Sequence, residues 1–251
     1  QGPSLERPAD LAGILTGLEN KSVLFIDEIH RIPVTVAEYL YSAMEDFQLN
    51  IMIDQGPHAR TVQLTIAPFT LIGATTREGL LTDPFRSRFG IFEKLELYPE
   101  NDLLKIIKRS ARILNVQGDE EALNLIARRS RGTPRIANQI LKRIRDVAQV
   151  KSNNFITQAI AEEGLKMLGI DEYGLVQTDR KILQTIIDNG GGPIGLKTIS
   201  ISIGEEEDTI EDVYEPYLIK CCMLEKTPRG RKVTAKAHEH LNKHPKEPRL
   251  F

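Results

Sequence analysis

The feature that most constrains the fold is a short apolar run that ends in two acids. Residues 23–26, Val-Leu-Phe-Ile, are followed directly by Asp27 and Glu28. A run of this length and composition is typical of a strand that is buried on both faces of a parallel sheet. We therefore predict such a strand over residues 23–29, and with it an α/β architecture for the first part of the chain.

The residues up to 97 continue this pattern. Helical spacing predicts a helix over 34–47, with Val36, Leu40, Met44 and Phe47 on one face. Two alternating stretches flank a Gln-Gly-Pro-His turn and predict a β-hairpin. The two arms of the hairpin are expected at 49–53 and 61–66. Apolar runs predict a second buried strand at 69–74 and a third strand at 91–97.

After Pro99 the pattern becomes helical, and the composition shifts near residues 98 and 171 divide the chain. We predict an α/β domain (1–97), an all-helical domain (98–170), and a helix-turn-helix domain with a hairpin (171–251). The helices expected in the second domain are 100–114, 119–131, 134–150 and 155–168. Those expected in the third are 178–189, 196–203, 207–220 and 235–243, with a hairpin over 221–234.

Composition excludes several classes of protein. The chain of 251 residues has 33 basic and 35 acidic residues, hence a formal charge of −2, which excludes a globally basic nucleic-acid binder but not a local basic patch. The two cysteines are neighbours in sequence, so no disulfide framework is expected. Neither a long apolar run nor a signal peptide is visible, and we expect a soluble intracellular protein with no membrane association.

Polar groups follow the first two predicted strands at their carboxyl ends. In open α/β sheets ligands bind beyond that edge. There Asp27 can hold Mg²⁺ and the adjacent Glu28 can polarise an attacking water. The second strand ends in Thr75-Thr76-Arg77, which brings hydroxyl groups to the same edge. Two solvated acids at the tip of a buried strand are the alternative interpretation.

Two arginine-bearing segments come next. In Phe85-Arg86-Ser87-Arg88-Phe89, aromatic anchors flank the arginines, an arrangement that can present one guanidinium to a neighbouring subunit. Arg135 lies in the first turn of a predicted helix, where a cation opposes the helix dipole, so an anionic partner such as phosphate would explain it. Ordinary surface arginines are the alternative in the first segment.

The order of these motifs resembles that of the AAA+ ATPases. The strings Phe-Ile-Asp-Glu-Ile-His-Arg, Gly-Ala-Thr-Thr-Arg, Arg-Gly-Thr-Pro-Arg-Ile-Ala-Asn and Glu-Asp-Val-Tyr-Glu-Pro-Tyr-Leu resemble those of the RuvB family, the bacterial Holliday-junction branch-migration motors. The resemblance covers residues 1 to about 243. It implies a fold of a partial α/β AAA+ core, an all-α lid and a winged-helix head.

The resemblance implies roles for the residues of the nucleotide site. Asp27 and Glu28 match the Walker B pair, for Mg²⁺ and water activation, and Thr76 matches sensor 1, with Thr75 as the less favoured choice. Arg88 matches the arginine finger that enters the next subunit's site. Arg135 matches sensor 2, which reaches the γ-phosphate from the lid.

Further positions are implied to bind nucleotide or protein. Tyr98 matches a residue that packs near the nucleotide, and Glu45, Asp46 and Phe47 resemble a segment that faces the adjoining subunit's nucleotide. The hairpin 49–66 occupies the place of the hairpin that docks on RuvA. Its apolar residues, Ile51, Ile53, Val62 and Leu64, fit either a core or a partner-facing role.

One departure from the family pattern bears on activity. The phosphate-binding loop Gly-x-x-x-x-Gly-Lys-Ser/Thr does not occur in the 251 residues. In the family this loop precedes the position of Gln1. We therefore expect an N-terminally truncated chain that lacks autonomous ATPase activity, although its parent would bind ATP and Mg²⁺.

The C-terminal domain is strongly polarised in charge. Seven acids lie between 205 and 215, whereas eight bases and two acids lie between 226 and 251. Phosphate repulsion disfavours the acidic helix as the DNA-contacting element. The hairpin with Lys226, Arg229 and Arg231 is similar to the wing of a winged helix, and we predict that these three residues contact the DNA backbone without sequence preference. The family more often has Arg at position 226.

Together these features predict an ATP-dependent motor for branch migration in recombination and repair. The resemblance implies a homo-hexameric ring around duplex DNA at Holliday junctions, with RuvA and RuvC as partners, in the bacterial cytoplasm. The main alternative is a winged-helix DNA-binding protein with a degenerate, non-hydrolysing AAA+ remnant. A clamp loader is a third, which the Arg-Gly-Arg wing disfavours.

Overall fold

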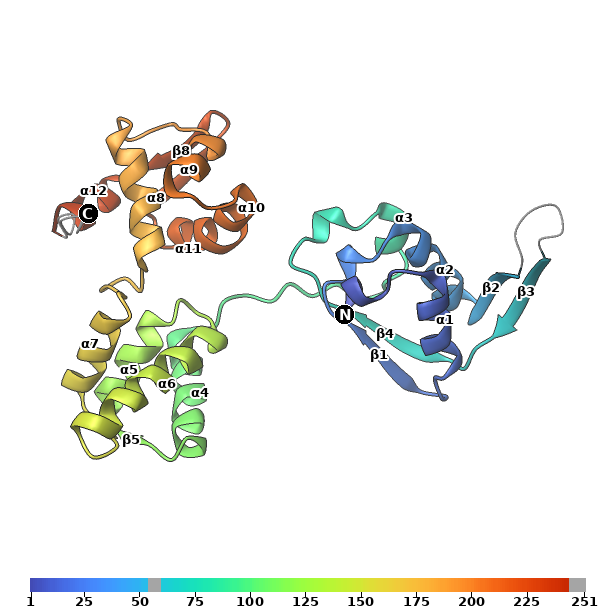
Figure 1. Cartoon of the computed structure of the whole chain (residues 1–251), viewed down its shortest axis with the longest axis horizontal. Helices are drawn as coiled ribbons and strands as arrows, with labels where there is room; N and C mark the ends of the chain where they lie inside the picture. Colours follow the sequence, from blue (N-terminus) through green and yellow to red (C-terminus); the bar gives the residue numbers. More distant parts are fainter. Residues whose placement is uncertain (54–59, 244–251) are drawn as a thin grey trace. The chain divides into compact units, whose positions relative to one another are not determined.

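A pair of parallel strands organises the first of two units in the chain. The computed structural model describes residues 1–53 and 60–243, and the chain divides into unit 1 (Gln1–Lys94) and unit 2 (Leu95–Phe251). In unit 1, β1 (Ser22–Ile26) pairs in parallel with β4 (Phe69–Gly73) (Figure 1). The register sets Leu24 opposite Leu71. The first two predicted strands are confirmed, and their carboxyl ends share one edge.

Only one face of this sheet is buried. Ile26 packs into a core with α1 (Pro8–Thr16) and α2 (Val34–Glu45). On the opposite face, Val23 and Phe25 are 59% and 58% exposed. The prediction of strands buried on both faces is therefore wrong for this chain, because successive side chains alternate between faces and the core of unit 1 lies on one side.

The predicted hairpin forms beside α2. β2 (Gln48–Ile53) and β3 (Arg60–Thr65) are antiparallel, with Ile51 opposite Val62. Ile51 and Leu64 pack against the core, whereas Val62 is 38% exposed. The core role is thus supported for two of the four apolar residues. The turn at 55–58 and the side chain of Ile53 lie outside the described residues.

The third predicted strand, 91–97, does not form. This segment has no strand structure, and Ile91 and Leu95 are 78% and 94% exposed. Apolar alternation forms a strand only where a neighbouring strand edge can pair with the backbone. In the described part of unit 1, β1 pairs only with β4 and β2 only with β3. Unit 1 also contains the short turns η1 (Gly2–Ser4), η2 (Ile29–Arg31), η3 (Glu78–Leu80) and α3 (Asp83–Arg86).

The first half of unit 2 is a helical bundle around its own apolar core. The predicted helices are confirmed except that the fourth starts later. Phe155–Ile156 forms β6, which pairs in parallel with β5 (Gln117–Gly118), and Thr157 then caps the helix by accepting the N–H of Ile160. The helices are α4 (Glu100–Ile113), α5 (Glu120–Arg129), α6 (Pro134–Lys151) and α7 (Gln158–Met167).

The second half of unit 2 surrounds another apolar core. The helix predicted over 207–220 is split by a π-helical turn, η4 (Ile210–Tyr214), directly before Glu215-Pro216. Proline has no N–H to donate to the preceding turn, which explains the irregularity. The elements are α8 (Gln177–Asp188), α9 (Leu196–Ile203), α10 (Glu207–Thr209), α11 (Glu215–Lys220), the antiparallel hairpin β7 (Leu224–Thr227) and β8 (Gly230–Val233), and α12 (Ala235–Lys243). In the described part of the chain, every helix is too short or too polar to cross a membrane.

Candidate functional site

Two carboxylates lie where β1 ends. The backbone N–H of Glu28 donates to Asp27 Oδ1 at 3.1 Å, and Glu28 adopts a positive φ of 52°. The parallel ladder continues past the strand, since Ile29 N–H donates to the carbonyl of Ala74 at 2.9 Å. This ladder fixes the acids relative to the threonines that follow β4.

The threonine hydroxyls reach these acids. Thr76 Oγ1 donates to Glu28 Oε2 at 3.3 Å. Thr75 Oγ1 lies 2.8 Å from His30 Nδ1, which in turn lies 3.2 Å from Glu28 Oε2. The carboxylate of Glu28 is thus held between Thr76 and His30. Sequence reasoning assigned no role to His30, because only the turn η2 reveals that its ring folds back toward Glu28.

The donor set at this edge fits a hard cation such as Mg²⁺ when phosphate supplies the other ligands. Asp27 is exposed and Glu28 half-buried, so carboxylate oxygens are accessible at the strand ends. Mg²⁺ sites of this kind use one or two carboxylates with substrate phosphates and waters. Among the described residues no three His, Cys, Asp or Glu side chains cluster as a complete protein-only metal site.

Arg88 is held within unit 1 by the end of α2. Its Nε lies 3.1 Å from Glu45 Oε1, and its Nη2 donates to Glu45 Oε2 at 3.3 Å. The guanidinium lies over the ring of Tyr41, 4.5 Å from the centroid, and Nη1 donates to the carbonyl of Pro84. Glu45 and Arg88, both predicted site residues, are therefore neighbours. The role of Tyr41 was not predicted, since a tyrosine on an amphipathic helix gives no distinctive sequence signal.

The other two residues of the predicted 45–47 segment point to different environments. Asp46 is exposed. The ring of Phe47 packs edge-on to Phe69 with centroids 6.3 Å apart, in the core of unit 1. Phe47 thus has a structural contact within its own unit, beside the nucleotide role that the sequence suggested.

Two predicted nucleotide-site residues belong to unit 2. Arg135 is exposed in the first turn of α6 and has no hydrogen bond or ion pair among the described residues. Tyr98 is 47% exposed, and its N–H donates to the carbonyl of Gly132 at 2.8 Å. Gly132 has a positive φ of 75°, and a Cβ there would lie 2.6 Å from Cβ of Leu97. The chain therefore packs closely between Tyr98 and the start of α6.

The wing separates the three predicted DNA contacts. The side chain of Arg231, on β8, reaches the acidic helix. Its Nε donates to Glu215 Oε1 at 2.5 Å and its Nη2 to Glu215 Oε2 at 3.1 Å, and 11% of the side chain is exposed. Lys226 pairs with Glu211. Arg229 is exposed at the tip, without a pairing partner among the described residues. Arg231 stays a predicted DNA contact, and its guanidinium already pairs with the buried carboxylate of Glu215, which needs this cation.

Comparison with known proteins covers nearly the whole chain. Three family models match in order: the Holliday junction DNA helicase RuvB P-loop domain at residues 1–95, the RuvB AAA lid domain at 98–171, and the RuvB C-terminal winged helix domain at 172–242. The Holliday junction branch migration complex subunit RuvB of Parabacteroides distasonis is 58% identical over 243 residues, which are 96% of this chain and 71% of the relative.

Solved structures agree with this match. The Thermotoga maritima RuvB Holliday junction branch migration motor is 50% identical with a TM-score of 0.84, covering 96% of this chain and 76% of that chain. A point mutant of the same protein is 49% identical with a TM-score of 0.86, covering 96% and 77%. The matched fold combines an AAA+ core, a lid and a winged helix, as the sequence predicted.

Proposed function

The chain belongs to the RuvB family of Holliday-junction branch-migration motors, and we propose that it acts as an ATP-dependent DNA motor that drives branch migration in recombination and repair. The family's P-loop ATPase domain implies nucleotide binding. We propose three domains, 1–97, 98–170 and 171–251, each built around one of the three apolar cores. ATP hydrolysis in the first domain would drive movement of the other two.

One observation carries the proposal for this chain's own residues. Thr76 donates to Glu28 at the carboxyl edge shared by β1 and β4, so a hydroxyl and the proposed water-activating carboxylate are already in contact. A threonine that donates to Glu28 can hold its carboxylate in one orientation. It can also exchange this bond for one to a γ-phosphate, which would link nucleotide state to the position of the base.

The proposed cofactors are ATP and Mg²⁺. When bound, Mg²⁺ neutralises charge on the phosphate oxygens. In this chain Asp27 would hold the ion through one carboxylate, Glu28 would orient the attacking water, and Arg135 would contact the γ-phosphate. Tyr98 would pack near the nucleotide. Because the 251 residues contain no phosphate-binding loop, we propose that the chain by itself lacks autonomous ATPase activity.

Assembly into a homo-hexameric ring is proposed to complete each site. Arg88 would act in trans on the adjoining subunit's nucleotide, together with Glu45, Asp46 and Phe47. In this structure Arg88 is bound to Glu45 of its own chain. A finger held in this way is oriented by α2, which the short turn η2 connects to Asp27-Glu28, so each subunit's own site would influence the arginine that it presents.

The wing and the hairpin are the proposed contacts to partners. Arg229 is accessible to DNA phosphates, and Lys226 can bind them if its ion pair with Glu211 opens. Lys232 on β8 is also exposed and is a further basic residue that the sequence did not single out. The hairpin 49–66 is proposed to dock on RuvA, with exposed Val62 on its surface. RuvC is proposed as a further partner at the junction, and the bacterial cytoplasm as the location of the protein.

The test is to join these 251 residues to a phosphate-loop segment of the Parabacteroides relative. ATPase and branch migration are then measured with RuvA and a synthetic four-way junction. We expect activity that Glu28→Gln abolishes. A rate that stays flat with DNA and RuvA present would support the degenerate-remnant alternative instead.

The trans role of Arg88 has a separate test in the same fusion. Arg88→Ala and Glu28→Gln subunits are mixed, and the two defects are expected to fall at different interfaces, which restores part of the activity. Absence of any recovery would argue against a finger that acts on the neighbouring subunit.

A further inference from the structure

A basic cavity lies in unit 2, between α6, the end of α7 and the segment that leads into α8. Its volume is about 620 Å³. Five of its lining residues are cations and one is an acid: Arg129, Arg131, Lys142, Arg143, Arg145 and Asp146. We call this space the junction cavity. None of its lining residues belongs to the proposed nucleotide site or to the wing.

The junction cavity has more basic side chains than carboxylates that pair with them. Arg131 pairs with Asp179 at 3.1 Å. Arg143 and Arg145 share a single acid, Asp146, at 3.6 Å and 2.7 Å. In the described part of the chain, the side chains of Arg129 and Lys142 have no ion pair or hydrogen bond. The cavity therefore concentrates positive charge that an anionic ligand would neutralise.

Most of the remaining lining is apolar. Ile136, Ile140, Leu168, Ile170 and Val176 contribute the remaining side-chain walls, beside Gln139 and the backbone of Gly174. Gly174 has a positive φ of 75°, and a Cβ there would lie 2.9 Å from the carbonyl oxygen of Arg129. This close approach brings the segment before α8 against the end of α5. An apolar wall facing several cations suits a ligand with an organic body and phosphate groups, and the volume lies in the range of small-molecule sites.

We propose that the junction cavity binds a phosphorylated small organic anion of nucleotide size, with Arg129 and Lys142 contacting its phosphates. A nucleic-acid duplex fits less well, because Arg129 and Arg131 are half-buried and the apolar walls would face a polar backbone. The residues that line the junction cavity all belong to unit 2, whereas the Asp27-Glu28 edge belongs to unit 1.

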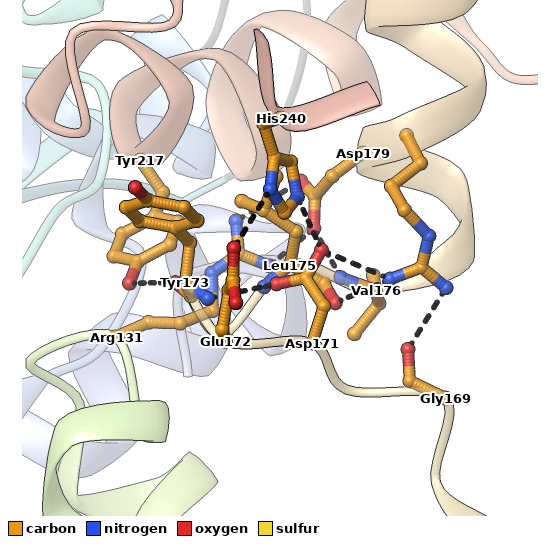
Figure 2. Close-up of polar contacts among 11 residues, drawn as sticks. Arg131, Gly169, Asp171, Glu172, Tyr173, Leu175, Val176, Asp179, Tyr217 and His240 are labelled. Atoms are coloured by element: carbon orange, nitrogen blue, oxygen red, sulfur yellow. Dashed lines mark hydrogen bonds and ion pairs between the residues drawn. The ribbon is translucent and has the colours of Figure 1, made fainter. Parts of the chain in front are cut away.

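Occupancy would act on the joint between the lid and the winged-helix head through Arg131. Figure 2 shows Arg131 between Asp179 and Tyr217, with its guanidinium 4.2 Å from the Tyr217 ring centroid. The Tyr217 hydroxyl donates to the carbonyl of Tyr173 at 2.7 Å. Because Arg131 lines the cavity and also holds this joint, a bound phosphate would share its donors with Asp179.

The experiment measures binding of ATP to the 251-residue chain by calorimetry at low salt. The sequence has no phosphate-binding loop, so such a loop cannot contribute to the signal. The variant Arg129→Ala/Lys142→Ala is expected to weaken binding by roughly tenfold or more, since charge-assisted hydrogen bonds are the strong ones. The matched control is Arg109→Ala/Arg112→Ala, which removes the same charge from exposed positions on α4. All variants are first checked for an unchanged melting temperature.

A second series separates this site from the proposed nucleotide site. ATP binding that is lost in Arg129→Ala/Lys142→Ala, whatever the effect of Arg135→Ala, supports the junction cavity. If Arg135→Ala abolishes binding and the cavity variant does not, the ligand sits at the lid's nucleotide-facing end and the proposal is wrong. An equal loss in the α4 control would reduce the effect to overall charge and would also contradict it.

The source of the phosphate is tested with two further probes. Inorganic tripolyphosphate should bind more weakly than ATP, because it makes no contact with the apolar wall. A short DNA duplex should not compete with ATP. Dependence on Arg129 and Lys142 that is seen only with the duplex would assign the cavity to nucleic acid and overturn the proposal, as would no ATP binding at millimolar concentration.

Discussion

Arg131 and Asp179 form a bidentate ion pair across the joint between the helical lid and the winged-helix head, with both nitrogen–oxygen distances at 3.1 Å. Asp179 is fully buried and also accepts the N–H of Val176 at 2.8 Å. Burial raises the pKa of Asp179, and Arg131 opposes this by favouring the carboxylate. A neighbouring cluster, in which His240 contacts Asp171 and Arg180 contacts both Asp171 and Gly169, joins the same segment to α8 and α12 (Figure 2).

Loss of one partner of this pair should destabilise the joint strongly. We expect Arg131→Ala to lower the free energy of unfolding of the head by about 3–5 kcal/mol, because a buried carboxylate then lacks its cation. Urea denaturation followed by near-UV circular dichroism measures this. The double variant Arg131→Leu/Asp179→Leu serves as control and should lose less, since no buried charge is left unpaired. A loss below about 1 kcal/mol for Arg131→Ala would show that the pair does not hold the joint.

The two wing arginines should separate stability from DNA binding. Arg231→Ala is expected to destabilise the head by roughly 3 kcal/mol, because buried Glu215 loses its partner. Arg229→Ala should change stability by less than about 0.5 kcal/mol. It should weaken duplex binding uniformly across sequences and reduce the salt slope by about one. Fluorescence anisotropy at several salt concentrations checks this, and sequence-selective loss would contradict backbone readout.

The attachment of the wing to the acidic helix should depend on pH. A hydrogen bond from Lys226 holds the pKa of Glu211 below its usual value of 4.5. A lowered carboxyl pKa gives stability that is present above the unfolded-state pKa and is lost as pH falls through the folded-state value. The difference in stability between the native chain and Glu211→Gln should therefore be largest at pH 6 and shrink as the pH falls below 4.5. It should stay below about 1 kcal/mol, because the pair is partly exposed.

The turn at the tip of the wing has a glycine that no other residue can replace without strain. Gly230 has a φ of 133°, and a Cβ there would lie 2.3 Å from the carbonyl oxygen of Ile194. We expect Gly230→Ala to cost about 1–3 kcal/mol from backbone strain alone. Gly195→Ala is the matched control, since its φ is −68° and no atom lies within 4 Å of the added Cβ. Equal thermal unfolding of the two variants would refute the packing argument.

Most of the helices were predictable because their apolar residues recur at helical spacing, which the chain carries locally. The shared edge of Asp27, Glu28, Thr75 and Thr76 was predictable for a related reason: parallel strands end on the same side. The strand expected over 91–97 failed, because its formation depends on a partner edge that local sequence does not specify. The π-helical turn before Pro216 was also missed, although the missing N–H of proline was a usable signal.

The sequence by itself determined the order of the elements, the family and the residue types available at each edge, since these follow from local periodicity and from motifs. Only the tertiary structure decided which cations are free and which are paired. The partners of these ion pairs are far apart in sequence. Arg131 and Asp179 are 48 positions apart, Arg88 and Glu45 are 43 apart, and Arg231 and Glu215 are 16 apart. The interaction energy of a cation with a carboxylate depends on the distance between them and is large only within a few ångströms. Such distances are set by packing, and packing pairs the predicted DNA contact Arg231 with the buried carboxylate of Glu215.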